Sequence, residues 1–389
     1  MSDRAADDAL SSLVTSTASI PPNELDRVVE RTARALGATS ARVLVADYAL
    51  VSLQEIGVDG PTGSHQSIDG TLPGRAFVRN EIVFSPEDPT FVCVPLEDQG
   101  ERLGVLELRH PYWTDEVRAA LDPIVRVLVL VLISKRRFTD TVLRSRRVRP
   151  LSLAAEMQWD LLPPPTCSTD VVSMSGILEP AYTIGGDAFD FAVNPGRVEF
   201  AIVDAVGHGM SAVSMSTSAV NSLRNARREG AGLETAYHDT GAVIRAQFGQ
   251  SYFVTGQLGA LALDTGVLTW LNAGHPRPLL VRDKSFVGEL TCAPSLPMGL
   301  GGSVAEIATE QLQPGDRVLF FTDGVSEAKS PAGEEFGVPR LADLLVRATL
   351  DSVSPAETAR RLSTSIVSFN NAGLNDDATL LLVDYHGNH

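Results

Sequence analysis

The sequence predicts an α+β protein of two domains, and three observations support this fold class. A chain of 389 residues is long enough for two or three domains. Its hydrophobic content of 44% and charged content of 21% are ordinary for a globular chain with buried cores. Helical and strand-like patterns alternate along the chain, and prolines at 150 and 163–165 separate an N-terminal from a C-terminal part.

Charge and cysteine usage limit the possible partners and location. The formal net charge of −16 argues against nucleic acid or an anionic membrane as the main partner. The three cysteines (Cys93, Cys167 and Cys292) form no CxxC motif, which favours free thiols in a reducing compartment. Residues 1–12 do not resemble a signal peptide, and the longest apolar run, 127–133, is too short to span a bilayer. We therefore expect a cytoplasmic protein.

The N-terminal part is expected to contain a mobile tail over residues 1–22 and a domain over 23–121. Apolar residues from Glu24 to Leu36 recur at helical spacing, and Gly37 follows where a C-terminal cap belongs. A short helix is expected after Gly70-Thr71-Leu72-Pro73-Gly74. The expected strands are residues 41–46, 50–53, 91–96 and 103–108.

This order of elements resembles a GAF domain. The matching residues are Gly70-Thr71-Leu72-Pro73-Gly74-Arg75-Ala76, Val92-Cys93-Val94-Pro95-Leu96 and Leu103-Gly104-Val105-Leu106-Glu107-Leu108. No cysteine is placed to attach a chromophore, and no nucleotide-binding signature is visible. The resemblance leaves two interpretations open, a ligand sensor and a purely structural or dimerising domain.

Residues 122–151 are expected to form a helical linker. Asp122 fits an N-cap and Pro123 fits the first helical position. The following residues are apolar all round, so the helix should be buried in the GAF-like layer or against a second copy, which predicts a homodimer. The helix should continue through basic residues as far as Arg149 and end at Pro150. Those basic residues form either a solvated face or a docking surface for an acidic partner.

The C-terminal domain is expected over residues 152–389, beginning with a short helix that Ser152 caps. A β-hairpin should follow, because Pro195-Gly196 lies between two apolar segments. A symmetric two-residue loop pairs residues whose numbers sum to 391, and Asp187 then lies opposite Asp204. Like charges at that distance require a proton or a cation between them unless both are solvated. The hairpin alone leaves a metal site and two solvated carboxylates as alternatives.

Two further aspartates are expected at strand ends. Asp323 follows an apolar strand over 317–321, and Asp376 directly precedes the last strand, 378–385. Carboxylates without Cys or His suit Mg²⁺ or Mn²⁺, and two such ions can activate a water for attack on a phosphoryl group. The other elements expected in this domain are helices over 209–227, 236–248, 341–348 and 355–369 and strands over 253–263, 267–273 and 278–282.

Over about residues 152–386 these elements resemble the SpoIIE-like branch of the metal-dependent 2C-type serine/threonine phosphatases. The matching motifs are Gly185-Gly186-Asp187-Ala188-Phe189-Asp190, Asp204-Ala205-Val206-Gly207-His208-Gly209, Asn272-Ala273-Gly274-His275-Pro276, Phe321-Thr322-Asp323-Gly324-Val325-Ser326-Glu327-Ala328 and Asp376-Asp377-Ala378-Thr379. The resemblance implies an α-β-β-α sandwich with two Mn²⁺ or Mg²⁺ ions between the ends of its sheets.

The resemblance also implies the roles of individual residues. Asp204 would bridge the two ions, and the backbone carbonyl of Ala205, where the family usually has Val, would be a further ligand. Asp323 and Asp376 would hold the second ion, and Asp187 would support the first. Three further residues could assist without binding metal directly: Asp190, His208 and Asp377. No substrate-binding residue can be predicted. Asp190 and Asp377 should point away from Asp187 and Asp376, respectively, because side chains alternate along a strand.

The expected substrate is phosphoserine or phosphothreonine on a bacterial regulatory protein, such as an anti-sigma-factor antagonist, and the N-terminal domain should regulate its hydrolysis. One alternative is a catalytically inactive scaffold that binds a phosphoprotein. Another is a degenerate diguanylate cyclase, because residues 185–189 differ from the GGDEF signature at one position, Ala188. The cyclase hypothesis leaves the motifs at Gly207, Asp323 and Asp376 unexplained.

Overall fold

The computed structural model describes residues 10–11, 14–15, 17, 19–57, 65–183, 185–302, 304–370, 374 and 376–387. The chain folds into two compact units, Met1–Pro150 and Leu151–His389, which are described separately. The tail expected over residues 1–22 lies mostly outside the described residues. Within it, the side chain of Ile20 is buried in the N-terminal core.

The N-terminal unit is built on a six-stranded antiparallel sheet with the order β3-β2-β1-β6-β5-β4. Its strands are β1 (Ser40–Ala46), β2 (Ser52–Glu55), β3 (His65–Ser67), β4 (Val83–Phe84), β5 (Phe91–Asp98) and β6 (Glu101–Arg109). One hydrophobic cluster joins the sheet to α2 (Leu25–Leu36) and α4 (Asp115–Lys135). A second joins it to α3 (Leu72–Arg79). Gly37 ends α2 in the left-handed conformation (φ 68°), as predicted.

The helix predicted from Asp122 is wrong in its bounds. Helix α4 is continuous from Asp115 to Lys135, the hydroxyl of Thr114 caps it, and Pro123 lies inside it. Its buried face spans the proline from Leu121 to Leu132, so packing offsets the loss of one backbone hydrogen bond. The helix also stops before Arg149, because a 3₁₀ turn (Arg136–Phe138) and α5 (Thr141–Ser145) follow it.

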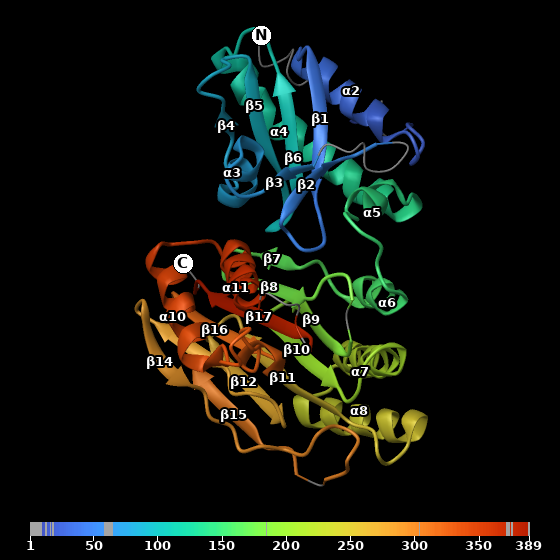
Figure 1. Cartoon of the computed structure of the whole chain (residues 1–389), viewed down its shortest axis with the longest axis vertical. Helices are drawn as coiled ribbons and strands as arrows, with labels where there is room; N and C mark the ends of the chain where they lie inside the picture. The colour runs from blue at the N-terminus through green and yellow to red at the C-terminus, as the bar shows by residue number, and fades with distance from the viewer. Residues whose placement is uncertain are drawn as a thin grey trace. The chain divides into compact units, whose positions relative to one another are not determined.

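The C-terminal unit has the expected α-β-β-α architecture (Figure 1). The first sheet has the order β15-β12-β11-β10-β9 and comprises β9 (Asp187–Asn194), β10 (Arg197–Ala205), β11 (Val254–Ala262), β12 (Val267–Ala273) and β15 (Ile307–Gln311). The second has the order β14-β13-β16-β17-β8-β7 and comprises β7 (Thr166–Ser168), β8 (Val172–Glu179), β13 (Leu279–Arg282), β14 (Ser285–Glu289), β16 (Asp316–Phe321) and β17 (Ala378–Tyr385).

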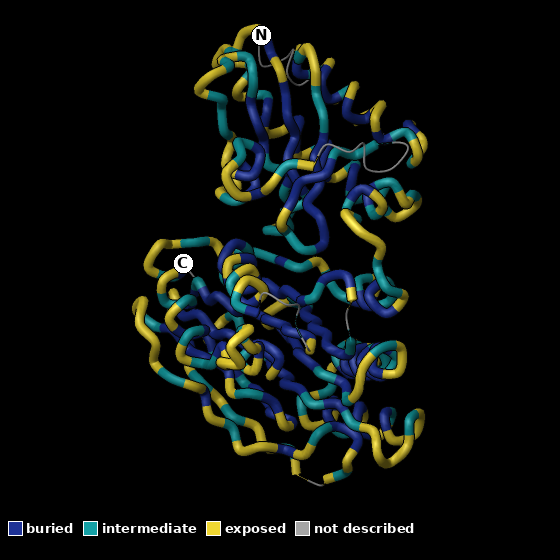
Figure 2. Tube along the Cα trace, in the orientation of Figure 1, coloured by how far each residue is buried: buried dark blue, intermediate teal, exposed yellow. Residues whose placement is uncertain are grey.

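Helices cover the outer face of each sheet. The first sheet packs against α7 (Met210–Arg228) and α8 (Leu233–Phe248), and α6 (Leu153–Leu161) packs on α7. The second sheet packs against α10 (Gly337–Leu350) and α11 (Pro355–Asn370), and the short α9 (Asp323–Ser326) follows β16. Figure 2 shows long buried stretches along the strands and exposed residues in turns and on helix surfaces.

The hydrophobic core between the two sheets determines which way the polar strand ends point. In β9 and β10, Phe189, Phe191, Phe200 and Ile202 belong to this core, whereas Ala188 and Ala201 pack toward α7 and α8. Because side chains alternate along a strand, Asp187 and Asp204 face the same way as the core phenylalanines.

Three further observations complete the fold. Strand β8 was not predicted from the sequence, and all eight of its residues are buried. All three cysteines are free. Within the described residues, no helix is both long and apolar enough to cross a membrane.

Candidate active site

The hairpin β9–β10 places two aspartates opposite each other. Its two-residue loop, Pro195-Gly196, pairs Asp187 with Asp204 in the antiparallel ladder, as the predicted register requires. Gly196 adopts φ 80°, a conformation that favours glycine over other residues. The loop therefore fixes the register that brings both carboxylates to one end of the sheet.

Asp187 is the most buried of the aspartates in the site, with 2% of its surface exposed. Its Oδ2 atom accepts hydrogen bonds from the hydroxyl groups of Thr322 (2.8 Å) and Thr379 (2.7 Å). Burial raises the pKa of Asp187 well above its usual value, and the charges of Asp204 and Asp377 raise it further. The two threonine hydrogen bonds act in the opposite direction because they stabilise the carboxylate.

Asp204 lies at the end of β10 and is partly exposed. Burial raises its pKa to about 7, and the charges of Asp323, Asp376 and Asp377 contribute in the same direction. A hydrogen bond between the Asp204 and Asp187 carboxyl groups lowers the pKa of Asp204. These interactions show that the aspartates from separate strands share one electrostatic environment.

The other three aspartates have different surroundings. Asp323 begins α9, and burial together with the charge of Asp376 raises its pKa. Asp376 is exposed and accepts a hydrogen bond from the backbone N–H of Asp377 (2.9 Å). Asp377 is buried, and its Oδ2 accepts hydrogen bonds from the backbone N–H groups of Gly185 (2.7 Å), Gly186 (2.7 Å) and Asp187 (3.2 Å). Asp376 and Asp377 therefore point to different places, as alternation predicts.

The donor set fits a hard divalent cation. Within the described part of the chain, none of the five aspartates forms an ion pair with Arg or Lys, so no described cationic side chain balances their charge. Among those same residues, no three acidic, His or Cys side chains converge tightly enough to enclose an ion as they stand. Mg²⁺ usually keeps several waters and binds through one or two carboxylates, so this open arrangement suits it or Mn²⁺.

Other predicted residues lie apart from this cluster. Asp190 points toward α7, where its buried carboxylate pairs with Arg224 (2.7 Å) and Arg227 (2.7 Å). This position agrees with the alternation expected along β9 and makes Asp190 a structural ion-pair partner. His208 is exposed in the loop before α7.

His275 is buried in a turn that its own backbone closes. The His275 N–H donates to Asn272 Oδ1 (2.7 Å), and Asn272 Nδ2 donates to the His275 carbonyl (2.9 Å). The ring atom Nδ1 lies 3.2 Å from the Thr255 hydroxyl, which in turn donates to the Asp204 carbonyl (3.3 Å). Burial lowers the pKa of His275 to about 3, so its ring is neutral. His275 thus stabilises the turn after β12, next to β11.

Sequence reasoning did not single out Thr255, Thr322 and Thr379 as functional residues. Thr322 and Thr379 were visible in the sequence as members of the motifs around Asp323 and Asp376. Their side chains have the same parity along β16 and β17 as the core residues Phe320 and Leu381, which places them between the sheets. That parity is the sequence observation that could have identified them.

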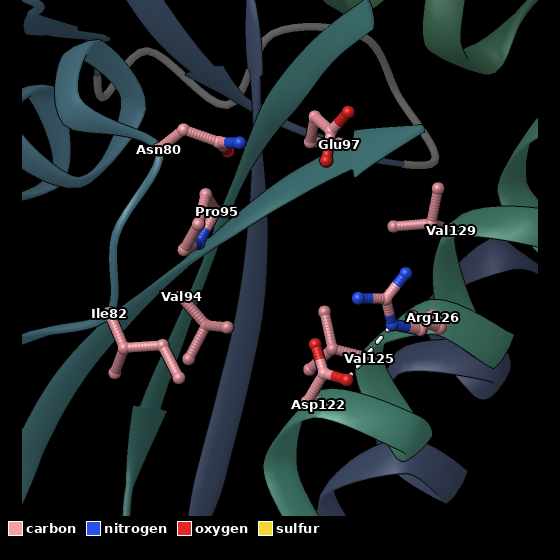
Figure 3. A pocket seen from close by; sticks show the side chains of 9 residues that line it. All are labelled: Asn80, Ile82, Val94, Pro95, Glu97, Asp122, Val125, Arg126 and Val129. Carbon is pink, nitrogen blue, oxygen red and sulfur yellow. Dashed lines mark hydrogen bonds and ion pairs between the residues drawn. The ribbon is translucent and has the colours of Figure 1, made fainter. Parts of the chain in front are cut away.

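The N-terminal unit has a small hollow between β5 and α4, with a volume of about 200 Å³ (Figure 3). Its lining mixes aliphatic and polar side chains, comprising Asn80, Ile82, Val94, Pro95, Glu97, Asp122, Val125, Arg126 and Val129. Small-molecule sites usually measure about 300–1,000 Å³. Two of the charged lining residues, Asp122 and Arg126, already pair with each other at 2.9 Å. The hollow therefore identifies no ligand, and both interpretations of the GAF-like domain remain predictions.

Comparisons with known proteins show what the C-terminal unit is similar to. The sequence model of the family described as "Stage II sporulation protein E (SpoIIE)" matches residues 194–386. The protein named phosphoserine phosphatase RsbU, of Bacillus subtilis strain 168, is 23% identical over 290 residues, which cover 72% of this chain and 83% of RsbU. Protein IcfG of Synechocystis sp. is 23% identical over 282 residues, and the match covers 64% of this chain but only 41% of IcfG.

A solved structure shows the same fold. The SiaA-PP2C domain of Pseudomonas aeruginosa superposes with a TM-score of 0.51 and 20% identity, covering 60% of this chain and 94% of that domain. The segment matched by the family contains Asp204, Asp323 and Asp376, and it begins within the hairpin, after Asp187. Residues 194–386 therefore match the SpoIIE family, and the chain is homologous to the phosphatase RsbU, with a C-terminal unit that has the fold of a PP2C-type phosphatase domain.

Proposed function

We propose that this protein is a metal-dependent phosphatase that hydrolyses phosphoserine or phosphothreonine on a regulatory protein. One observation carries the proposal: five aspartates gather at the strand ends of a SpoIIE-family domain without an Arg or Lys partner among the described residues. Such a cluster needs protons or cations to balance its charge. A protonated cluster has no evident use, whereas a cation-loaded cluster is suited to phosphoryl chemistry.

The proposed ligands follow the geometry of the hairpin and its neighbours. Asp204 would bridge two Mn²⁺ or Mg²⁺ ions, with the Ala205 carbonyl and Asp187 on one side and Asp323 and Asp376 on the other. When bound, these ions lower the pKa of a coordinated water and offset the charge of the phosphoryl group. Gly186 leaves room beside the Ala205 carbonyl, because a Cβ at position 186 would lie 2.6 Å from that oxygen. Asp377 would keep the Gly185–Asp187 segment in place through its backbone hydrogen bonds.

The activity test uses the full chain with a small aryl phosphate. We expect hydrolysis with Mn²⁺ or Mg²⁺ and none after treatment with EDTA. Full activity in a chelated, metal-free preparation would overturn the metal-dependent mechanism. This assay separates the phosphatase from a degenerate cyclase, which finds no support in the SpoIIE-family fold.

The protein substrate is a finer proposal. RsbU is named a phosphoserine phosphatase, and by analogy we propose that this chain acts in the cytoplasm on a phosphorylated bacterial regulator such as an anti-sigma-factor antagonist. Phosphorylated candidates encoded by the same genome should lose phosphate in the presence of the full chain. Failure on all of them, combined with hydrolysis of small metabolite phosphates, would contradict a protein substrate.

A second candidate function is an inactive scaffold that binds a phosphoprotein without hydrolysing it. Calorimetry with a phosphopeptide substrate and with Mn²⁺ distinguishes the two functions. Peptide binding without Mn²⁺ binding or phosphate release would identify an inactive scaffold.

We also propose that the N-terminal unit regulates the phosphatase as part of a homodimer. Two exposed apolar side chains, Leu130 on α4 (58% exposed) and Phe138 in the 3₁₀ turn after it (75% exposed), support a contact with a second copy. Within the C-terminal unit, Arg224 donates to the carbonyl of Leu161 in α6 (2.7 Å) and to Asp190 in β9 (2.7 Å). A displacement of α6 would thus act on the strand that carries Asp187.

A further inference from the structure

Two threonines of the second sheet hold a carboxylate of the first. The hydroxyl groups of Thr322 and Thr379 both donate to Oδ2 of Asp187, at 2.8 and 2.7 Å. Thr322 follows β16, Thr379 lies in β17, and Asp187 begins β9 in the opposite sheet. These hydrogen bonds therefore cross the space between the two sheets.

The direction of these hydrogen bonds is set by their surroundings. Both threonines are fully buried, so water does not compete for their hydroxyl groups. Thr322 Oγ1 also accepts a hydrogen bond from the backbone N–H of Thr379 (2.9 Å). A hydroxyl has a single proton, so the Thr322 hydroxyl donates to Asp187. Its oxygen accepts the hydrogen bond from the backbone N–H of Thr379 in the neighbouring strand. Oδ2 of Asp187 is thus occupied by two donors from different strands.

We propose that Thr322 and Thr379 are positioning residues that hold Asp187 Oδ2 and leave Oδ1 for the metal. This proposal rests on the metal-dependent function proposed above. A carboxylate rotates about its terminal bond unless hydrogen bonds restrain it, and a rotated Asp187 would present a different oxygen to the ion. Hydrogen-bond partners of metal ligands commonly contribute about 10–100-fold to metal affinity.

The two threonines differ in a way that sharpens the test. The hydroxyl of Thr379 bonds only to Asp187 among the described residues, whereas that of Thr322 also satisfies a backbone N–H. Replacing Thr379 with valine keeps the shape of the side chain and removes that one hydrogen bond. Replacing Thr322 with valine also leaves a buried N–H without a partner, so it should cost additional stability.

The experiment measures Mn²⁺ binding by calorimetry in the full chain. We expect Thr379→Val to weaken Mn²⁺ affinity about 10–100-fold and Thr379→Ser, which keeps the hydroxyl, to restore it. The matched control is Thr240→Val, since Thr240 is equally buried but bonds to Ser222 in the helical layer (3.1 Å). The control should lose thermal stability without losing Mn²⁺ affinity.

The outcomes separate this inference from the proposed function. Unchanged Mn²⁺ affinity in folded Thr379→Val, alongside an active wild-type enzyme, would overturn the positioning role and leave the phosphatase intact. Weakened Mn²⁺ binding that serine restores would support the positioning role even if no phosphatase activity were found. Absence of Mn²⁺ binding by the wild type would overturn both proposals. If Thr379→Val does not fold, Thr379→Ala replaces it, with the same serine comparison and the same criteria.

Discussion

The carboxylate of Asp377 binds the backbone N–H of Gly186 at 2.7 Å and thereby joins the start of the last strand to the segment before β9. Gly186 also lies against β10 and α7, where a Cβ would come within 2.6 Å of the Ala205 carbonyl oxygen and 3.0 Å of Ala212 Cβ. A side chain at position 186 therefore cannot be accommodated without moving β10 or the segment that Asp377 holds.

Gly186→Ala should abolish metal binding while leaving most of the fold in place. The added methyl group displaces the Ala205 carbonyl or breaks the hydrogen bond to Asp377, and both changes disturb the proposed ligands. Calorimetry with Mn²⁺ measures the loss. Gly232→Ala is the control, since a Cβ there meets nothing within 4 Å. Normal Mn²⁺ affinity in Gly186→Ala would contradict this prediction, because it would show that the added Cβ can avoid the Ala205 carbonyl without disturbing the metal ligands.

Asp204→Asn should remove both phosphatase activity and two-metal binding, because the amide cannot serve as a charged bridging ligand. His275→Ala should retain most of both, because the His275 ring contacts only Thr255 among its described hydrogen-bond partners. Loss of the His275 ring should instead reduce the free energy of unfolding by about 1–3 kcal/mol. Calorimetric titration and chemical denaturation compare the variants. Tight two-metal binding by Asp204→Asn would contradict the bridging assignment.

Metal binding should strengthen with pH and level off above about pH 7, since the pKa of Asp204 is raised to about 7 and the ion binds the carboxylate form. Titrations in buffers of different ionisation enthalpy should detect the released protons. In the metal-free protein, between the ordinary aspartate pKa of 3.8 and the raised pKa of about 7, Asp204 is protonated in the folded state and ionised in the unfolded state. Its contribution to stability should therefore decrease as pH rises through that interval. A pH-independent Mn²⁺ affinity would argue against a protonated Asp204.

Asp190→Asn should destabilise the fold without changing Mn²⁺ affinity. Its buried carboxylate pairs with Arg224 and Arg227 on the helix side of β9, away from the aspartate cluster. Removing one member of a buried ion pair commonly costs about 3–5 kcal/mol. Chemical denaturation measures the loss, and Mn²⁺ titration of the folded variant tests the separation. Weakened Mn²⁺ binding by Asp190→Asn would show that Asp190 contributes to the metal site.

Leu130→Glu should dissociate the proposed homodimer and change phosphatase activity by about 5- to 150-fold if the two units are coupled. Leu130 is exposed, so a charge there leaves the core intact, whereas Leu128 (1% exposed) belongs to the core and its substitution would unfold the unit. Light scattering and the aryl phosphate assay are the measurements, and a chain starting at Leu151 is the comparison. The proposal would be contradicted if the wild type were monomeric and had the same activity as Leu130→Glu and as the chain starting at Leu151.

The hairpin could be predicted in full because its turn type and its alternation of apolar residues determine the register independently of the rest of the chain. Strand β8 was missed although its first half, Val172–Ser175, alternates between apolar and polar residues. Its second half, Gly176–Glu179, breaks that alternation, and both faces of the strand are buried. The continuity of α4 through Pro123 was missed because the tertiary packing of its apolar face overrides a local helix breaker. The threonines around Asp187 depend on contacts between residues more than 130 positions apart, which no local pattern encodes.

The pairing of Asp187 with Asp204 has a consequence for how this hairpin can change in length. One residue inserted within β9 or β10 would reverse the faces of all residues beyond it, so one aspartate would turn toward α7 while its partner kept its direction. The segment between the two aspartates should therefore tolerate substitutions at exposed positions such as Arg197 but not single-residue insertions within its strands. Length variation that preserves function should be confined to the loop at Pro195-Gly196, which gives engineers one defined place for inserting a tag or reporter.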